Sequence, residues 1–226
     1  MSEEYRTLLA LCTSALVCGA LAQGVRWQRA QREDSAAKVA ANGESGITRA
    51  GRAVRELSVP RVGGYALLAG LWVSGFDLPW AALLAAFVLG AIDDWRPMGA
   101  GVKALGQCVP AALLGLEVGG EAGIWIGLLA WVAQNAVNTF DHADGFLCAL
   151  GGTAFPPLLA APFLGVLPWN LLLRAKNRAG GDVAQAYFGD GGSLLAGVLL
   201  ASQPEARWFL LVPTLDLARV VGLRLL

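Results

Sequence analysis

Charged residues are scarce in this chain of 226 residues. Asp, Glu, Lys and Arg make up 15% of the sequence, whereas hydrophobic residues make up 56%. A soluble domain carries roughly 25% charged residues, so the charge here is too thin to cover a soluble globule. Histidine occurs only once, and the four cysteines lie in apolar runs without the spacing of metal ligands. These shortages argue against a soluble domain and against a cysteine metal site.

The apolar residues come in blocks, which predict an all-α fold, a polytopic membrane bundle with about nine transmembrane helices. The blocks lie at about 8–25, 62–76, 79–92, 103–119, 122–138, 146–160, 160–173, 191–203 and 206–222. Several are shorter than the roughly 20 residues that cross a bilayer unaided, and their Gly and Pro residues predict bent or tilted, closely packed helices. The run FPPLLAAPFLGVLPWN fits one broken helix or two short ones. We expect one transmembrane domain over 1–226, with a cytoplasmic basic loop at about 26–61.

Positive charge is unevenly distributed, although the net charge is zero. If the N-terminus lies outside and each segment crosses once, only Arg6 and Arg207 of the seventeen Lys and Arg residues face outward. Positive residues collect on cytoplasmic loops, so this orientation is the expected one. The inward-facing residues are Arg26, Arg29, Arg32, Lys38, Arg49, Arg52, Arg55, Arg61, Arg96, Lys103, Arg174, Lys176, Arg178, Arg219 and Arg224.

Aspartates stand where long apolar stretches meet polar loops. Asp93 and Asp94 follow AALLAAFVLGAI, Asp141 and Asp144 lie in NAVNTFDHADG, and Asp190 lies in AYFGDGGSLLAG. A carboxylate beside a lipid-length apolar run is costly to desolvate, so such residues are rare unless they are functional. Three clusters at the same kind of boundary predict one acidic site on the cytoplasmic side that handles a metal ion and phosphates.

The adjacent pair Asp93 and Asp94 is costly to ionise without a cation nearby. Lys103 begins the next apolar block, and we expect it to fold back over the pair. The pair then fits a metal or base site, in which an ionised Asp removes a proton or holds a phosphate through Mg²⁺. A solvated helix end is the alternative.

Polar residues recur every three positions in NAVNTFDHADG. If this segment is helical, Asn135, Asn138, Asp141 and Asp144 share one stripe, which must face protein or water rather than lipid. His142 is displaced from that stripe, so we expect a loop residue rather than a catalytic base.

Two glycine-rich motifs stand at expected helix starts. GDGGS, residues 189–193, offers backbone amides and one carboxylate, which together can hold an anion and a cation. VPRVGG, residues 59–64, brings Arg61 to the phosphate-rich membrane interface, and Gly63 and Gly64 allow a helix or a ligand to approach closely. Each motif alone also fits an ordinary helix start.

In their order along the chain, these motifs resemble the polyprenyl-phosphate N-acetylhexosamine-1-phosphate transferase family. The family includes undecaprenyl-phosphate GlcNAc-1-phosphate transferase and phospho-MurNAc-pentapeptide transferase. The resemblance covers the chain from about Arg52 to its end. It rests on RAVRELSVPRVGG, IDDWRPMGAGVKALGQ, NAVNTFDHADG, LPWN, AYFGDGGSLLAG and PTLDLARVVGLRL.

The resemblance implies a Mg²⁺-dependent transfer of a sugar-1-phosphate, with Mn²⁺ as a substitute. A polyprenyl phosphate of the inner leaflet attacks a UDP-N-acetyl amino sugar and releases UMP, in cell-wall or surface polysaccharide synthesis. The implied location is the bacterial inner (plasma) membrane, and the implied partners are both substrates and membrane lipid, without nucleic acid. Family members are commonly homodimers. The segment PRVGG favours a sugar of the GlcNAc type.

The resemblance also implies residue roles. Asp190 matches the family's metal ligand, and Asp93 and Asp94 match the pair proposed to orient or deprotonate the lipid phosphate. Asp141 and Asp144 match further residues of the nucleotide and metal region. The residues implied to bind the substrates are Asn138, Asn170, which meets the nucleotide, Tyr187, which stacks on uracil, Lys103 and Arg61.

The chain departs from the family's pattern in three ways. Ala53 and Arg55 replace a Lys and a His, and residues 141–145 read DHADG where the family reads DGLDG. Family members continue past a segment like PTLDLARVVGLRL into a cytoplasmic loop with clustered histidines, which the present sequence does not contain. The resemblance therefore leads us to expect a fragment or a shortened relative.

Two other functions fit the same residues. An ion- or proton-coupled transporter also uses intramembrane carboxylates, but here the carboxylates gather at one face rather than near the midplane, and only Asp216 is expected to be buried within a span. An inactive relative that binds lipid or a partner transferase is the second alternative. The intact aspartates argue against it, whereas the missing histidine loop argues for it.

Overall fold

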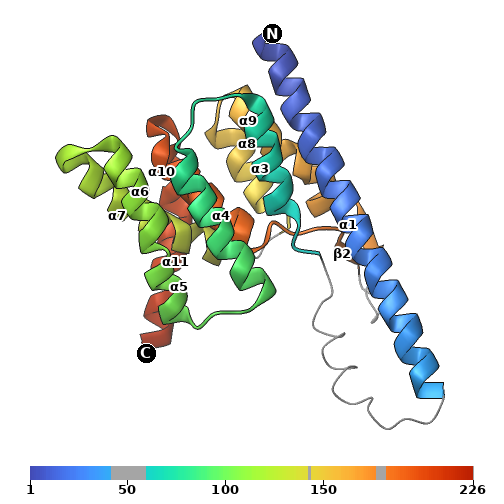
Figure 1. Cartoon of the computed structure of the whole chain (residues 1–226). Coiled ribbons are helices and arrows are strands. Elements are labelled where there is room, and N and C mark those ends of the chain that lie inside the picture. Colours follow the sequence, from blue (N-terminus) through green and yellow to red (C-terminus); the bar gives the residue numbers. More distant parts are fainter. Residues whose placement is uncertain (42–59, 142–143, 177–181, 226) are drawn as a thin grey trace.

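The computed structural model describes residues 1–41, 60–141, 144–176 and 182–225, which form a helical bundle (Figure 1). The all-α prediction is confirmed, apart from a short antiparallel ladder of β1 (Arg174–Lys176) and β2 (Asp182–Ala184). The helical elements are α1 (Glu3–Ala41), α3 (Gly63–Ser74), α4 (Trp80–Trp95), α5 (Ala100–Gly106), α6 (Cys108–Val118), α7 (Gly120–Phe140), α8 (Phe146–Ala154), α9 (Pro157–Leu167), the π-helical η1 (Pro168–Leu172), α10 (Gly189–Ser202), the 3₁₀-helical η2 (Pro204–Leu210) and α11 (Leu211–Leu225).

Most helices follow the expected apolar blocks, but some boundaries differ. The block at 103–119 forms two helices, α5 and α6, and the block at 206–222 begins as η2 and continues as α11. We placed a boundary at residue 160, but the chain leaves the helix at Phe155 and re-enters it at Pro157. The cause is Pro156, which lacks an amide hydrogen and favours an extended residue before it. The run FPPLLAAPFLGVLPWN therefore follows α8 as the short helix α9, which continues directly into the π-helical η1. At the N-terminus, α1 extends through Ala41 into the expected basic loop, of which residues 42–59 lie outside the described structure.

Helix α10 lies at the centre of the bundle, and the other helices position its first turn. Every residue from Gly191 to Ala201 is buried, and the helix packs against α3, α4 and α7. A helix that is apolar on all sides belongs inside a protein. Asp190 in the first turn of α10 is therefore fixed by packing on several sides.

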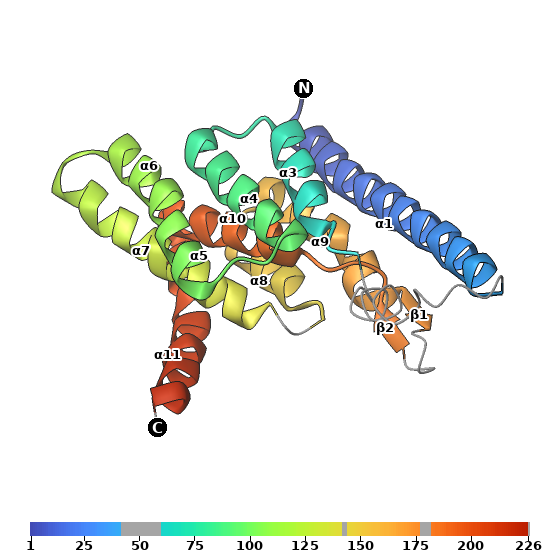
Figure 2. The same cartoon turned by 60° about the horizontal axis from the view of Figure 1, so that its bottom comes forward.

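The outer helices extend the bundle in opposite directions from α10. α1 lies along one side and the α6–α7 hairpin along the other, while α11 projects away from the bundle (Figure 2). The outer surfaces of α1, α6 and α7 carry large apolar side chains, such as Leu16, Leu116 and Trp125, and Trp208 of η2 is 82% exposed. Water does not favour so many exposed apolar groups, whereas the interior of a bilayer does.

Two helical stretches of the described chain, Glu3–Arg26 and Ala100–Val118, are long and apolar enough to cross a membrane. Gly63–Ser74 and Pro157–Leu172 are apolar but shorter. These findings point to a membrane protein. The expected number of about nine transmembrane helices stays a prediction.

Candidate active site

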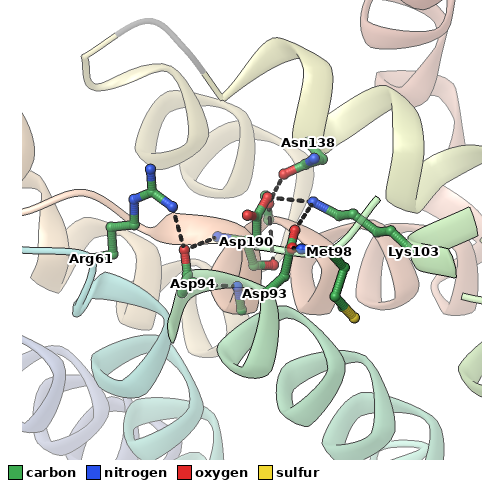
Figure 3. A network of polar contacts seen from close by, with 9 residues as sticks. Arg61, Asp93, Asp94, Met98, Lys103, Asn138 and Asp190 are labelled. Atoms are coloured by element: carbon green, nitrogen blue, oxygen red, sulfur yellow. Dashed lines mark hydrogen bonds and ion pairs between the residues drawn. The ribbon is translucent and has the colours of Figure 1, made fainter. Parts of the chain in front are cut away.

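Four of the five predicted aspartates meet at one end of the bundle, where α4 and α7 end and α10 begins. Asp93 and Asp94 lie in the last turn of α4, Asp190 lies in the first turn of α10, and Asp141 follows α7. The chain thus brings together carboxylates that are up to about a hundred residues apart in sequence (Figure 3). Asp144, the fifth, lies in the turn that precedes α8.

The ammonium group of Lys103 lies between two of these carboxylates (Figure 3). Its Nζ atom is 2.8 Å from Asp93 Oδ2 and 2.6 Å from Asp190 Oδ1, and its side chain is only 14% exposed. The prediction that Lys103 folds back over the aspartate pair is confirmed for Asp93. Its contact with Asp190 joins α4, α5 and α10 through one cation.

The sharp turn after α4 explains how Lys103 reaches this position. Pro97 cannot continue the helix, and the backbone amide of Met98 donates a 2.5 Å hydrogen bond to Asp93 Oδ1. Gly99 is extended, and α5 starts directly after it. Asp93 therefore stabilises the turn and also binds the lysine that the turn presents. The sequence did not suggest this use of the Met98 amide.

The carboxylate of Asp94 caps α10. The amides of Asp190 and Gly191 each donate a 3.0 Å hydrogen bond to it, and the guanidinium of Arg61 approaches it to 3.2 Å. The first amides of a helix have no partner within the helix and favour an anion. The expected anion seat of GDGGS is therefore taken by the chain's own carboxylate from α4, in place of a phosphate.

Burial and hydrogen bonds set the pKa values of the carboxyl groups in different directions. Burial raises the pKa of Asp93, but hydrogen bonds from Lys103 and Met98 outweigh it and hold the pKa below the usual value. At Asp94 burial dominates and raises the pKa, although two backbone amides and a guanidinium oppose the rise. Burial also raises the pKa of Asp141 well above the usual value.

A polar cavity of about 320 Å³ opens beside these groups. Its described lining residues are Arg61, Asn138, Asp141, Tyr187, Gly189 and Asp190. Burial is the largest cause of the raised pKa of Asp141, and the negative charges of Asp190 and Asp94 raise it further. A cation bound in the cavity would favour the ionised form of this carboxyl. The cavity is thus suited to a ligand that combines a cation with polar groups.

A short backbone ladder forms one rim of the cavity. The amide of Tyr187 donates to Pro60 O at 2.9 Å, and the amide of Gly63 donates to Tyr187 O at 2.8 Å. Arg61 and Tyr187 pair in parallel in this ladder, so a cation and an aromatic ring lie next to each other on the cavity wall. Both were predicted as substrate-binding residues.

Two glycines allow α3 and α4 to contact the backbone of the first turn of α10. A Cβ atom on Gly64 would lie 2.5 Å from Gly192 N, and one on Gly90 would collide with the carbonyl of Asp190. The close approach expected at Gly64 is confirmed. Gly90 was missed, although its position three residues before the aspartate pair was a signal for it.

Two amide side chains of the predicted site have different roles. Asn138 accepts a 2.7 Å hydrogen bond from the hydroxyl of Ser193, which links α7 to α10 beside the cavity. Asn170 is buried, accepts a hydrogen bond from the Gly145 amide at 2.6 Å and donates to Ala186 O at 3.0 Å. Asn170 therefore joins the backbone before α8 to the segment that leads to Tyr187.

The expected polar stripe in NAVNTFDHADG is helical only in its first half. α7 ends at Phe140, and Asp141 has left the helical conformation. The amide of Asn135 donates to Trp131 O within the same helix. The stripe therefore brings Asn138 and Asp141 to the cavity, whereas Asn135 lines a neighbouring cavity. His142, Ala53 and Arg55 lie outside the described residues.

The neighbouring cavity measures about 770 Å³ and lies between α5, α7 and α11. Lys103 and Asn138 stand where it adjoins the acidic site. The rest of its lining combines apolar residues, such as Phe140, Val220 and Val221, with polar ones that include the ion pair of Asp216 and Arg219. Asp216, the one carboxylate expected within an apolar block, also lines this cavity. The described lining residues of this cavity are Ala100, Lys103, Asn135, Asn138, Thr139, Phe140, Asp216, Leu217, Arg219, Val220 and Val221.

The donor groups of the site are carboxylate oxygens, which suit Mg²⁺. Within the described residues, no three His, Cys, Asp or Glu side chains are arranged to hold one ion by themselves. Mg²⁺ is commonly held by one or two carboxylates together with waters and substrate phosphates. Asp93 and Asp190, which already share one cation at short distance, fit that requirement.

No protein-family model matches the chain, and a search of curated proteins finds no significant match.

Proposed function

We propose that this protein is a membrane-bound, Mg²⁺-dependent transferase that moves a sugar-1-phosphate from a UDP-N-acetylhexosamine to a polyprenyl phosphate and releases UMP. The observation that carries the proposal is the meeting of Asp93, Lys103 and Asp190 beside two adjoining cavities. One cavity is lined mainly by polar residues, and the other also has an apolar wall with Phe140, Leu217, Val220 and Val221. Such a pair suits one water-soluble substrate and one lipid substrate that react at a shared boundary.

The acidic cluster is suited to a pyrophosphate bound through a metal ion. Two carboxylates of the site share one cation and come from α4 and α10. These helices pack closely on each other, and this packing can hold both carboxylates in position when the cation is exchanged. Mg²⁺ held there with the pyrophosphate would neutralise the charge that builds on the phosphoryl oxygens in the transition state. Much of the rate of phosphoryl transfer comes from positioning and charge neutralisation.

The residues of the polar cavity are suited to the nucleotide. The ring of Tyr187 offers a face on which a base can stack, and the exposed guanidinium of Arg61 offers hydrogen bonds to phosphate. Asp141, which binds its proton unusually tightly, is suited to hydrogen bonding with a hydroxyl or with phosphate oxygen. Asn138 stands at both cavities and is suited to orient the group that passes between them.

The residues of the larger cavity are suited to the lipid phosphate and its chain. Lys103 faces this cavity at its acidic end, where its ammonium can attract a phosphate, and the apolar residues of α11 can cover isoprenoid carbons. Asp93 lies within contact of Lys103 and its pKa is low, so it is ionised at neutral pH. An ionised carboxylate at this point can orient the attacking phosphate, whereas the low pKa of Asp93 makes it a weak acceptor for a proton.

The proposal includes a membrane setting with about nine crossings and the acidic site on the cytoplasmic side. The exposed apolar side chains of α1, α6, α7 and η2 support it, as does the inward excess of Lys and Arg in the sequence. A transporter fits less well, because the carboxylates gather at helix ends rather than along a path through the bundle. An inactive relative also fits less well, because the aspartates of the site are all present.

The proposal is tested by exchange of labelled UMP into UDP-GlcNAc in the presence of undecaprenyl phosphate and Mg²⁺. The purified protein in nanodiscs is compared with Asp190→Asn, which keeps the size of the side chain and removes its charge. Loss of a group that positions a metal and a pyrophosphate should lower exchange by about 10³-fold or more. Purified protein that supports no exchange with UDP-GlcNAc or with another UDP-N-acetyl amino sugar would contradict the proposal.

Asp77→Asn is the matched control for Asp190→Asn. Asp77 is exposed in the turn before α4, whereas the acidic site lies at the other end of that helix. The two ends of a 16-residue helix are about 24 Å apart. The control should exchange at the wild-type rate, and equal losses in both variants would assign the effect to folding instead of to the site.

A further inference from the structure

The position that a metal ion would take in the acidic site is held by a cation of the chain itself. Lys103 Nζ contacts Asp93 Oδ2 at 2.8 Å and Asp190 Oδ1 at 2.6 Å, and the three side chains are only 14%, 8% and 19% exposed. An ammonium and a divalent cation cannot occupy the space between the same two oxygens. A metal ion bound between these two oxygens therefore has to replace this lysine.

The two carboxylates would repel each other if Lys103 left and no other cation took its place. They come from α4 and α10, which Gly90 allows to touch at the first turn of α10, so the helices cannot separate freely. Unscreened carboxylates at this distance repel each other. In the absence of metal, Lys103 supplies the neutralising charge, and it also joins α5 to the bundle.

Lys103 has a place to which it can move. Its side chain also lines the 770 Å³ cavity between α5, α7 and α11. No residue of the short helix α5 is fully buried, so the lysine is carried by a loosely packed element. A modest rotation of the side chain would transfer the ammonium from the carboxylates to the wall of that cavity.

We propose that Lys103 is the resident cation of the metal-free site and that a divalent cation displaces its ammonium into the larger cavity. This inference rests on the proposed function, because it assigns the displaced ammonium to the phosphate group of the second substrate. Metal binding then prepares the second cavity for an anion. Since coupling between two ligands is reciprocal, a phosphate that holds Lys103 in the cavity strengthens metal binding to the same degree.

Metal affinity provides the first test. Mn²⁺ binding is followed by electron paramagnetic resonance for the wild type, Lys103→Met and Arg61→Gln, after thermal unfolding has verified that each is folded. Removing the competing cation in Lys103→Met should tighten Mn²⁺ binding by about tenfold or more. Arg61 is the matched control, because its half-exposed guanidinium is near the site and forms its ion pair with Asp94 rather than with Asp93 or Asp190. Its removal should tighten binding by less than about threefold, since exposed charges are screened.

Chemical labelling of the unmodified protein provides the second test and does not depend on a variant. The sequence contains three lysines, Lys38, Lys103 and Lys176. An amine-acylating reagent with mass spectrometry should modify Lys103 faster after Mg²⁺ is added, by roughly threefold or more as the ion pair opens. The other two lysines are internal standards, and their rates should not change.

The outcomes separate this inference from the proposed function. Mn²⁺ that binds the wild type with unchanged Lys103 labelling, or Lys103→Met that tightens binding no more than Arg61→Gln, would overturn the displacement of Lys103 and leave the metal-dependent transferase in place. Absence of Mn²⁺ binding in the wild type would overturn both. Tighter binding in Lys103→Met together with faster labelling of the wild type supports the inference.

Discussion

Gly90 offers a way to move the catalytic end of α10 without changing any polar group of the site. It lies in α4 against the first turn of α10, where a Cβ atom would stand 2.5 Å from Gly191 N and would collide with the carbonyl of Asp190. The neighbouring atoms are backbone and cannot rotate away. The substitution Gly90→Ala therefore has to push the two helices apart.

The size of this effect follows from the contact. Ordinary van der Waals contact begins at 3.4 Å, so the first turn of α10 has to move by roughly 1 Å. Overpacking of this kind lowers the free energy of unfolding by about 1–3 kcal/mol. The better helix propensity of Ala offsets at most about 1 kcal/mol of that loss. A shift of about 1 Å at a reacting group can lower the rate by about 100-fold. The protein should therefore stay folded while its rate of exchange falls by about 100-fold.

The measurements are UMP exchange and thermal unfolding, with Gly101→Ala as the control. Gly101 lies in α5 two residues from Lys103, and a Cβ atom there would meet nothing within 4 Å. We expect Gly101→Ala to retain exchange, whereas Gly90→Ala should lose about 100-fold. Exchange by Gly90→Ala within about threefold of wild type would refute the claim that this helix contact positions Asp190.

Two further predictions concern buried polar groups. The side chain of Gln107 is fully buried, and neither of its polar atoms has a hydrogen-bond partner among the described residues, so Gln107→Met should raise the free energy of unfolding by about 1–2 kcal/mol. The control Gln134→Met, which removes hydrogen bonds of 3.1 and 3.2 Å, should lower it, and equal shifts in thermal unfolding would contradict the assignment. The folded protein holds the pKa of Asp141 above its usual value of 3.8, so above that pH the unfolded chain releases a proton that the folded chain retains, and stability falls as pH rises toward the raised pKa. Asp141→Asn should remove this part of the fall, and an unchanged pH profile of thermal unfolding would count against it.

Local features of the sequence predicted most helices and the gathering of the aspartates. Blocks of apolar residues and the positions of proline and glycine determine where helices start and stop, and this information lies within a few residues of each boundary. The expectation for Lys103 also used a local argument, since only a short turn separates it from Asp93. The shift of the break to Pro156 shows the error to expect where proline occurs in a purely apolar run.

The partners of the site residues could not be predicted in the same way. The hydrogen bond between Asn138 and Ser193 and the capping of α10 by Asp94 join positions more than fifty residues apart. Nothing in a single sequence states which helix end meets which. The same limit applies to the buried amide of Asn170, whose two backbone partners lie 25 and 16 residues away in the sequence.

The pair Asp93 and Asp94 illustrates how helix geometry divides two adjacent carboxylates between two tasks. Successive residues of a helix point about 100° apart, so one carboxylate faces α5 while the other faces the first turn of α10. Asp93 meets Lys103, and Asp94 meets the amides that begin α10. The capping bonds of Asp94 hold the backbone of Asp190 itself, so the residue that stabilises the helix end also fixes the carboxylate that shares Lys103 with Asp93. A change at either aspartate is therefore expected to affect both the fold of this helix end and the cation it holds.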